Sequence, residues 1–176
     1  LDAVTDEDTS TDIDVVANDT DPDGDTLIVS DVTQPDNGTV INNGTDVTYT
    51  PDDDWNGEDT FTYTVTDGLE GSDTGTVVVT VNPVQDWPVA VDDDATTNEE
   101  TPGDIVVVDD DYDPDGDDLT VVDVPIPPSN GNTVINPDDT ITYTPDENFE
   151  GTDHFTYEIS DGHGHTDRGE VEVVVL

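Results

Sequence analysis

The chain carries the same sequence pattern twice, with an offset of 92 to 94 residues. A Thr-Tyr-Thr-Pro segment at 48–51 recurs at 142–145, and a Gly-x-Asp-x-Phe-Thr-Tyr segment at 57–63 recurs at 151–157. Self-similarity over a length of this size indicates tandem copies of one module. Each copy, at about 90 residues, is long enough to bury one small core. We therefore expect domain 1 over residues 1–85 and domain 2 over 86–176, with a linker at roughly 82–92.

Within each copy, short runs of β-branched and aromatic residues alternate with turn signals. The runs at 47–50, 61–65 and 76–81 are rich in Val, Thr and Tyr, as strands are. Asn-Gly and Asp-Gly pairs, which favour tight turns, separate them. No segment shows helical periodicity. The pattern predicts an all-β fold with about seven strands per copy, which is typical of a β-sandwich.

The charge of the chain narrows its possible partners. It has 47 acidic residues against a single Arg or Lys, and a formal net charge of -46. Such a surface repels nucleic acids and anionic membranes, so neither is expected as a partner. The self-repulsion must be offset by bound cations, by high salt, or by both. The chain has no cysteine, which excludes disulfides and thiolate metal sites.

The chain also lacks the signals of export and membrane insertion. It has no methionine, so we expect it to be part of a longer protein whose other segments direct its export. No apolar run is long enough to cross a membrane. The first residues, 1–3, are expected to be the end of a linker equivalent to 82–92.

An acidic loop occurs once in each copy, at 19–25 and at 111–117, with the pattern D-x-D-P-D-G-D. Carboxylates at alternate positions, closed by a glycine, suit a hard cation with oxygen ligands. An EF-hand loop would need a glutamate at its twelfth position, where this chain has Ser30 and Val122. Each loop is therefore part of a site whose other ligands come from elsewhere. The candidate ligands in the loops are Asp19, Asp21, Asp23, Asp25, Asp113, Asp115 and Asp117.

These strings together resemble a known family. The Ala-Asn-Asp-x-Asp-Pro-Asp-Gly-Asp loop at 17–25, the Glu-Asp-Thr at 7–9, the Tyr-Thr-Pro at 49–51 and the segment at 61–68 are similar to bacterial cadherin-like repeats of the VCBS type. Such modules form long arrays in large secreted or surface adhesins of Gram-negative bacteria. The resemblance covers essentially the whole chain. It implies two tandem Ig-like or cadherin-like Greek-key β-sandwich domains in a secreted or bacterial cell-surface protein.

In cadherin-type modules, Ca²⁺ lies between successive domains, so the resemblance also implies a ligand set. The linker, the second acidic loop, the Asp that ends a late strand, the first-strand acid of the preceding domain and a further acid near 58–59 would contribute. In this sequence they are Asp86 and Asn82, then Asp113, Asp115 and Asp117, then Asp161 with its counterpart Asp67, then Glu7, Asp8 and Asp59. The usual Asn-Asp-Ala-Pro linker reads Gln-Asp-Trp-Pro at 85–88, which leaves the Asn ligand open. The first loop has no preceding linker here, so we expect its site to be weaker.

The resemblance implies a calcium-binding, calcium-rigidified extracellular repeat pair that mediates adhesion or acts as a spacer. Its partners would be neighbouring repeats of the same chain, with a cell-surface or polysaccharide ligand as a further candidate. The alternative is a carbohydrate-binding module in which Trp87 or Tyr112 stacks on a sugar. A third reading takes the acidity as an adaptation to high salt. These three hypotheses are compatible with one another. If folding depended on the KCl concentration but not on calcium, the high-salt hypothesis would be favoured.

No enzyme activity is expected. No serine lies in a nucleophile context, and turns account for the abundant acids better than a glycosidase pair does. His163 and His165 could bind a transition metal, but two imidazoles on one turn make a weak site, so we expect turn residues. The triplet at 92–94, Asp-Asp-Asp, is equally compatible with ligands and with solvated charge. Trp55 aligns with Phe149 and is expected to pack against the core.

Overall fold

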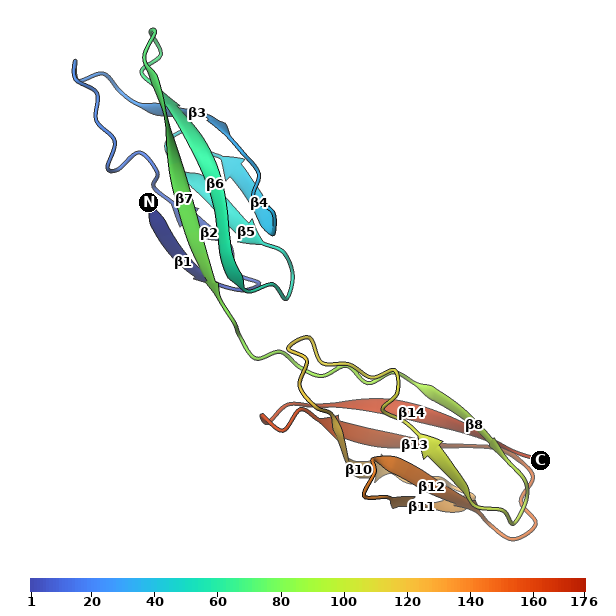
Figure 1. The fold of residues 1–176 in the computed structure, drawn as a ribbon. Coiled ribbons are helices and arrows are strands. Elements are labelled where there is room, and N and C mark those ends of the chain that lie inside the picture. Colours follow the sequence, from blue (N-terminus) through green and yellow to red (C-terminus); the bar gives the residue numbers. More distant parts are fainter. The chain divides into compact units, whose positions relative to one another are not determined.

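The computed structural model describes all 176 residues and consists of strands, turns and loops (Figure 1). It divides into two compact units, Leu1–Val84 (unit 1) and Gln85–Leu176 (unit 2), and each is described by itself. The structure contains no helix long and apolar enough to cross a membrane.

Each unit has seven strands, as the sequence predicts. Those of unit 1 are β1 (Asp2–Asp6), β2 (Thr11–Ile13), β3 (Ile28–Val32), β4 (Gly38–Asn42), β5 (Val47–Pro51), β6 (Gly57–Thr66) and β7 (Ser72–Asn82). Those of unit 2 are β8 (Asp93–Thr97), β9 (Gly103–Val106), β10 (Thr120–Ile126), β11 (Gly131–Ile135), β12 (Thr140–Pro145), β13 (Gly151–Ser160) and β14 (Thr166–Val175).

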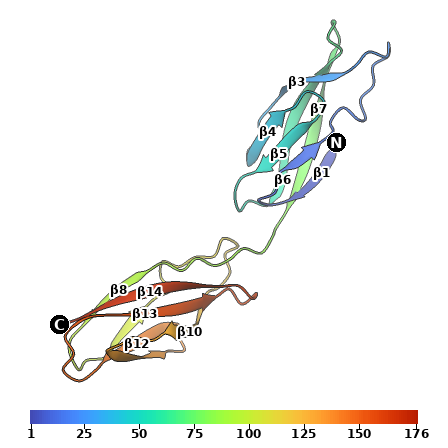
Figure 2. The ribbon, with the colours of Figure 1, turned by 180° about the vertical axis from the view of Figure 1, so that it is seen from behind.

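Two sheets form each unit, and the two units share one topology. In unit 1 the sheets have the orders β1-β7-β6-β3 and β2-β5-β4, and in unit 2 the orders β10-β13-β14-β8 and β11-β12-β9. The first strand of each unit runs parallel to the last, while the other pairs are antiparallel. The view from behind shows the same layers (Figure 2). The predicted all-β fold of two tandem sandwiches is thus confirmed.

Strict alternation along the long strands builds the cores. On β6 the buried positions are 59, 61, 63 and 65, so one face of the strand is covered and the Thr-rich face is not. Tyr49 and Phe61 stack in unit 1 with ring centroids 6.4 Å apart, and Tyr143 and Phe155 repeat this in unit 2 at 6.3 Å. Burying each such side chain contributes about 1.5–3 kcal/mol. Trp55 packs against the core of unit 1, which confirms that prediction.

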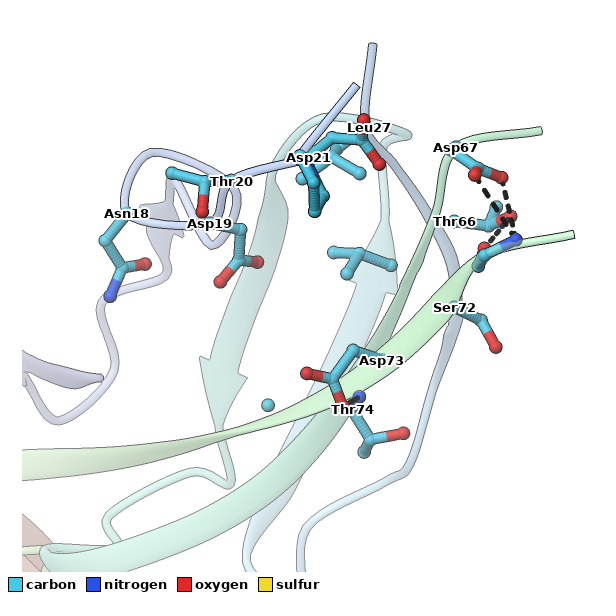
Figure 3. A pocket seen from close by; sticks show the side chains of 14 residues that line it. Asn18, Asp19, Thr20, Asp21, Leu27, Thr66, Asp67, Ser72, Asp73 and Thr74 are labelled. Atoms are coloured by element: carbon cyan, nitrogen blue, oxygen red, sulfur yellow. Dashed lines mark hydrogen bonds between the residues drawn. The ribbon is translucent and has the colours of Figure 1, made fainter. Parts of the chain in front are cut away.

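The long β2–β3 and β9–β10 connections carry the two acidic loops. In unit 2 the loop lies beside the turn between β13 and β14, at one end of the sandwich. The distance of 3.5 Å between His163 Nε2 and Asp117 Oδ1 shows this proximity. In unit 1 the corresponding loop and turn line one groove, which contains Asp21 and Asp67 (Figure 3). The fold thus brings together acids that lie more than 40 residues apart in the sequence.

Candidate metal centre

The acidic loop of unit 2 folds around Asp113. The Asp113 Oδ1 atom accepts a hydrogen bond from the backbone N–H of Asp115 at 2.9 Å, and the Asp113 carbonyl accepts one from Gly116 at 3.0 Å. Gly116 has φ 78°, a left-handed conformation that glycine adopts without strain. Asp113 is only 8% exposed, and its Oδ2 atom is buried without a hydrogen-bond partner. A carboxylate oxygen in that state is costly unless a cation or a proton faces it.

Two further carboxylates lie beside Asp113. Carboxylate oxygens of Asp113, Asp115 and Asp117 lie within 4.8 Å of one another. Two unit charges about 4 Å apart repel by about 4 kcal/mol near a protein surface. The Gln85 amide reduces this repulsion, because its Nε2 donates to Asp115 Oδ2 at 2.9 Å and to Asp117 Oδ2 at 2.7 Å. The cluster is therefore held by neutral donors and lacks a full countercharge.

The segment that enters unit 2 closes over this loop. The backbone N–H of Asp86 donates to Asp115 Oδ2 at 2.7 Å, and the Asp86 carbonyl lies 3.0 Å from His165 Nδ1. The Trp87 indole stacks on the His165 imidazole, with ring centroids 4.9 Å apart and planes inclined by 19°. Of the predicted linker ligands, Asp86 therefore reaches the acidic loop through its backbone.

Asp161, which follows β13, is the most enclosed acid at this end of unit 2. Its side chain is fully buried, and Oδ1 accepts the backbone N–H groups of His163, Gly164 and His165 at 2.7 to 3.1 Å. Burial acts to raise the pKa of Asp161, but these donors outweigh it and hold the pKa below its ordinary value. His165 Nδ1 lies 3.1 Å from Asp161 Oδ2, yet Oδ2 receives no hydrogen bond. Asp161 is not a member of the three-carboxylate cluster.

The equivalent loop of unit 1 is built alike but is more open. Asp21 Oδ1 accepts the backbone N–H of Asp23 at 2.8 Å and of Asp25 at 3.1 Å, and both of those acids are exposed. Asp67 accepts N–H donors from its own turn, as Asp161 does, but is partly exposed. Asp19 accepts a hydrogen bond from the Tyr63 hydroxyl at 3.2 Å.

The predicted ligands of the first domain lie at the end of unit 1 where β7 leaves it. Glu7 is 2% exposed, and its carboxylate accepts hydrogen bonds from Val84 N–H and from Asn56 Nδ2. Asn82 accepts the Glu7 N–H through its carbonyl and donates through Nδ2 to Asp6. Asp8 is exposed and accepts the N–H of Asp54 at 3.1 Å. The aligned Glu99 of unit 2 is exposed.

Asp59 has a different environment from the other predicted ligands. Its carboxylate accepts backbone N–H groups from Asp36, Asn37 and Thr60 and the hydroxyl of Tyr49. The equivalent Asp153 repeats these contacts in unit 2. Both are buried, and neither belongs to an acidic cluster. Four donors around one carboxylate tie a loop to a strand, which is an internal structural role.

A second group of acids surrounds Tyr157 in unit 2. The Tyr157 hydroxyl lies 2.7 Å from the Val91 carbonyl, 3.1 Å from the Val107 carbonyl and 3.0 Å from Asp111 Oδ1. Nearby, Asp93 Oδ2 is buried without a hydrogen-bond partner. Burial raises the pKa of Asp93 to about 7, with the Tyr157 hydroxyl opposing the shift, and burial also raises the pKa of Asp111. One hydroxyl proton cannot serve all these acceptors, so the group is short of hydrogen-bond donors.

Two residues of the candidate centre were missed by sequence reasoning. Gln85 occupies the Asn position of the linker pattern, which signalled an amide in the linker but not its contact with the loop. His165 was expected to be a turn residue only, yet it contacts Asp86 and Asp161 and supports Trp87. No sequence signal marks the contacts of His165 with Asp86 and Trp87, because those residues lie far away in the chain.

The arrangement fits a hard cation. Calcium takes six to eight oxygen ligands and is suited to carboxylates and amide carbonyls in flexible geometry. Asp113, Asp115 and Asp117 supply carboxylates, and Gln85 carries an amide that could present its oxygen instead of its nitrogen. The buried, unpartnered Oδ2 of Asp113 is the observation that tests this fit, since a bound cation would satisfy it. The oxygen-only donor set does not favour zinc.

The chain is similar to known proteins in sequence family and in fold. A sequence model described as a bacterial Ig domain matches the chain twice, over residues 2–80 and 85–174. No curated protein matches the sequence. A structure of mouse cadherin-23 EC22-24 aligns over 99% of this chain and 63% of that chain, with 17% identity and a TM-score of 0.50. At this identity and TM-score, the similarity shows that the two proteins share a fold.

Other solved structures are longer than this chain. An endo-fucoidan hydrolase from glycoside hydrolase family 107 aligns over 100% of this chain and 27% of that chain, with 22% identity and a TM-score of 0.41. A structure of human CDH23 EC21-23 aligns over 85% of this chain and 57% of that chain, with 14% identity and a TM-score of 0.45. The chain thus spans well under two thirds of either protein.

Proposed function

Because the chain belongs to the bacterial Ig domain family and carries that domain twice, we propose that it is a calcium-binding repeat pair of an extracellular bacterial surface protein. Domains of this family occur in bacterial surface proteins, and this pair acts there as a structural spacer or an adhesive segment. Its partners are neighbouring repeats and a cell-surface ligand. No catalytic role is proposed for it.

One observation carries the calcium proposal: the Oδ2 atom of Asp113 is buried and unpartnered beside two further carboxylates. A cation bound there would balance charge that Gln85 and backbone donors only partly offset. It would also order the segment that enters unit 2, because Gln85 and Asp86 are bonded to the same carboxylates. We expect affinity in the weak extracellular range, about 10⁻⁴ to 10⁻³ M.

The two units are not expected to bind equally. Asp113 and Asp161 in unit 2 are buried, while their counterparts Asp21 and Asp67 in unit 1 are partly exposed. Water already solvates the exposed carboxylates of unit 1, so a cation that replaces this water gains less binding free energy there. We therefore assign the stronger site to unit 2.

The test is a calcium titration by calorimetry, together with unfolding in excess calcium and in chelator at matched ionic strength. We expect calcium to raise the unfolding temperature. We expect the Asp113→Asn substitution to reduce both the heat of calcium binding and this rise in unfolding temperature. Asp118→Asn is the control, because it removes the same charge from an exposed neighbour of the cluster. Equal unfolding temperatures with and without calcium in the parent chain would refute the proposal. A dependence on KCl alone would assign the acidity to salt adaptation.

A carbohydrate-binding role is the second candidate, and Trp87 is the observation that favours it. The indole is 64% exposed although its ring is already oriented by stacking on His165. An exposed, oriented aromatic face beside a calcium site suits a sugar ring. Retention on insoluble polysaccharides that is lost in Trp87→Ala would support this role, and absence of retention across a broad panel would leave the spacer role.

A further inference from the structure

Each of the four sheets has two edge strands, and the charge on these strands is uneven. The edge strands of unit 1 are β1, β2, β3 and β4, and those of unit 2 are β8, β9, β10 and β11. All of them contain Asp except β4 and β11, which contain no charged residue. Charged side chains on an edge strand hinder its pairing with another chain. β4 and β11 therefore lack this form of protection.

Unit 1 protects β4 by other means, with two side-chain amides. Gln34 Nε2 donates to the Val40 carbonyl at 2.9 Å, and Gln34 Oε1 accepts the Val40 N–H at 2.8 Å. Asn42 Nδ2 donates to the Val29 carbonyl at 2.9 Å and so ties β4 to β3. Val40 is only 5% exposed. The backbone groups that Val40 turns away from β5 are thus satisfied within unit 1.

In unit 2, β11 occupies the place of β4. Thr133 lies opposite Tyr143 as Val40 lies opposite Tyr49. The Thr133 N–H and C=O therefore point to the open edge of the sheet, because successive residues of an antiparallel strand turn these groups to alternate sides. Thr133 is partly exposed. The edge at Thr133 is thus more accessible than the edge at Val40.

Neither amide of unit 1 is repeated beside β11. The loops before β4 and β11 make equivalent hydrogen bonds, and their alignment places Pro127 where unit 1 has Gln34. The strand ladders place Ile135 where unit 1 has Asn42. Proline and isoleucine have no side-chain amide, so the Thr133 N–H and C=O have no such cap. Uncapped backbone groups along an edge are a template for an added strand.

We propose that β11 is a self-association surface that pairs with β11 of a second copy of this chain. The two strands run antiparallel about a two-fold axis, so that Thr133 exchanges both backbone hydrogen bonds with Thr133 of the second copy. The exposed side chain of Val134 then lies opposite Asn132 of the second copy. Two sheets of order β11-β12-β9 become one six-stranded sheet. The inference goes beyond the proposed function and does not depend on calcium.

Charge favours a second copy as the occupant. The chain has a net charge of -46, so two copies repel each other over most of their surface. The segment 124–137, which contains β11, has no charged residue. Pairing at β11 therefore brings no carboxylates of the two strands together. A basic partner strand would instead be attracted to the edge strands that contain Asp.

The test is sedimentation equilibrium of the full chain in chelator, at about 0.1 M and about 1 M KCl. We expect a monomer–dimer equilibrium that is tighter at high salt, because screening weakens the repulsion between the two acidic copies. Dilution of the ¹⁵N-labelled chain should shift the amides of residues 132–135 and leave Val40 unchanged. A chain that stays monomeric up to about 1 mM at high salt would overturn the proposal, and so would a dimer whose amide shifts lie outside β11.

Exchanging the caps between the units gives a matched pair of variants. Pro127→Gln supplies unit 2 with the amide of unit 1 and should weaken self-association at least about tenfold. Gln34→Pro removes the amide from β4, which leaves each chain with two uncapped edges, and should produce species larger than a dimer. Self-association of Pro127→Gln as strong as that of the parent chain would count against pairing at β11.

A second pair of variants tests the register. Val134→Glu adds a charge at the junction and should weaken self-association several-fold, and adding Asn132→Lys should restore it by placing Lys opposite Glu of the second copy. Ile41→Glu is the control, because Ile41 holds the equivalent place on the capped β4 and is similarly exposed, at 60% against 53% for Val134. An equal loss in Ile41→Glu, or no recovery in the double variant, would contradict the proposed pairing.

Discussion

The ring of Tyr157 lies over Gly169, the residue opposite it on β14. A β-carbon built at Gly169 would lie 2.5 Å from Tyr157 Cε1, closer than any side chain tolerates. Tyr63 covers Gly75 in unit 1 in the same way, at 2.4 Å. Because the glycine leaves room for the ring to lie along the sheet, the Tyr157 hydroxyl reaches Asp111 and the Val91 carbonyl. The pair thus connects the sheet to the segment that enters unit 2.

Gly169→Ala should therefore destabilise unit 2. The Tyr157 ring would be forced aside, and overpacking of this kind costs about 1–3 kcal/mol. Gly103→Ala is the control in the same unit, because its β-carbon would meet only Thr97 at 3.6 Å, an ordinary contact. Urea unfolding followed by circular dichroism would compare them. A loss in Gly103→Ala as large as that in Gly169→Ala would contradict the steric explanation.

Asp93→Asn should stabilise unit 2 at pH 8 but not at pH 5. The folded-state pKa of Asp93 is raised to about 7 by burial, above its unfolded value of about 3.9. Between those values the folded chain binds the proton more tightly, so stability falls as the pH rises towards 7 and stays low above it. In Asp93→Asn the buried charge is absent, so stability no longer varies with pH through this group. We expect a gain of about 1–2 kcal/mol at pH 8, reduced from the full shift by solvent screening.

Thermal unfolding of Asp93→Asn and the parent chain across this pH range, in chelator, measures that difference. Asp94→Asn serves as the control, because it is the exposed neighbour on β8 and should change stability little at either pH. A difference between Asp93→Asn and the parent that does not vary with pH would show that Asp93 is ionised throughout.

Asp153→Asn should destabilise unit 2 at neutral pH without changing calcium affinity. The amide nitrogen would face either the N–H groups of Ser129 and His154, which donate to Oδ1, or the N–H of Asn130, which donates to Oδ2, at a cost of about 1–3 kcal/mol. Burial acts to raise the pKa of Asp153, but its donors outweigh it and lower the pKa. The stabilisation by Asp153 is therefore present above about pH 4 and lost as the pH falls through the lowered folded-state value.

Denaturant unfolding from pH 7 to pH 3 would show the cost of Asp153→Asn shrinking with acid, and calorimetry would show its calcium heat unchanged. Asp109→Asn, at an exposed position, controls for the loss of charge. A large fall in calcium affinity would instead assign Asp153, and with it Asp59, to a metal site.

Asp59 and Gln85 show which structural features could be predicted from the sequence and which could not. Alternation along β6 places position 59 on the buried face together with Phe61, so the sequence contained a signal for a buried carboxylate. The repeated turns and acidic loops likewise follow from local patterns. The reach of Gln85 to Asp117 could not be predicted, because it depends on how a linker docks on a loop 32 residues later. Only the folded chain brings such pairs together.

Gln85→Glu should have opposite effects on stability and on calcium affinity. The substitution keeps the shape but replaces two N–H donors with a fourth carboxylate beside Asp115 and Asp117. In chelator the added repulsion should lower stability by about 1 kcal/mol, a few degrees in unfolding temperature. With calcium the same charge becomes an additional ligand, so affinity should rise severalfold. Asn98→Asp adds an equal charge at an exposed position of unit 2 and should do neither. Calorimetry and thermal unfolding in both conditions test this, and a fall in both quantities would show that Gln85 stabilises the loop without facing the ion.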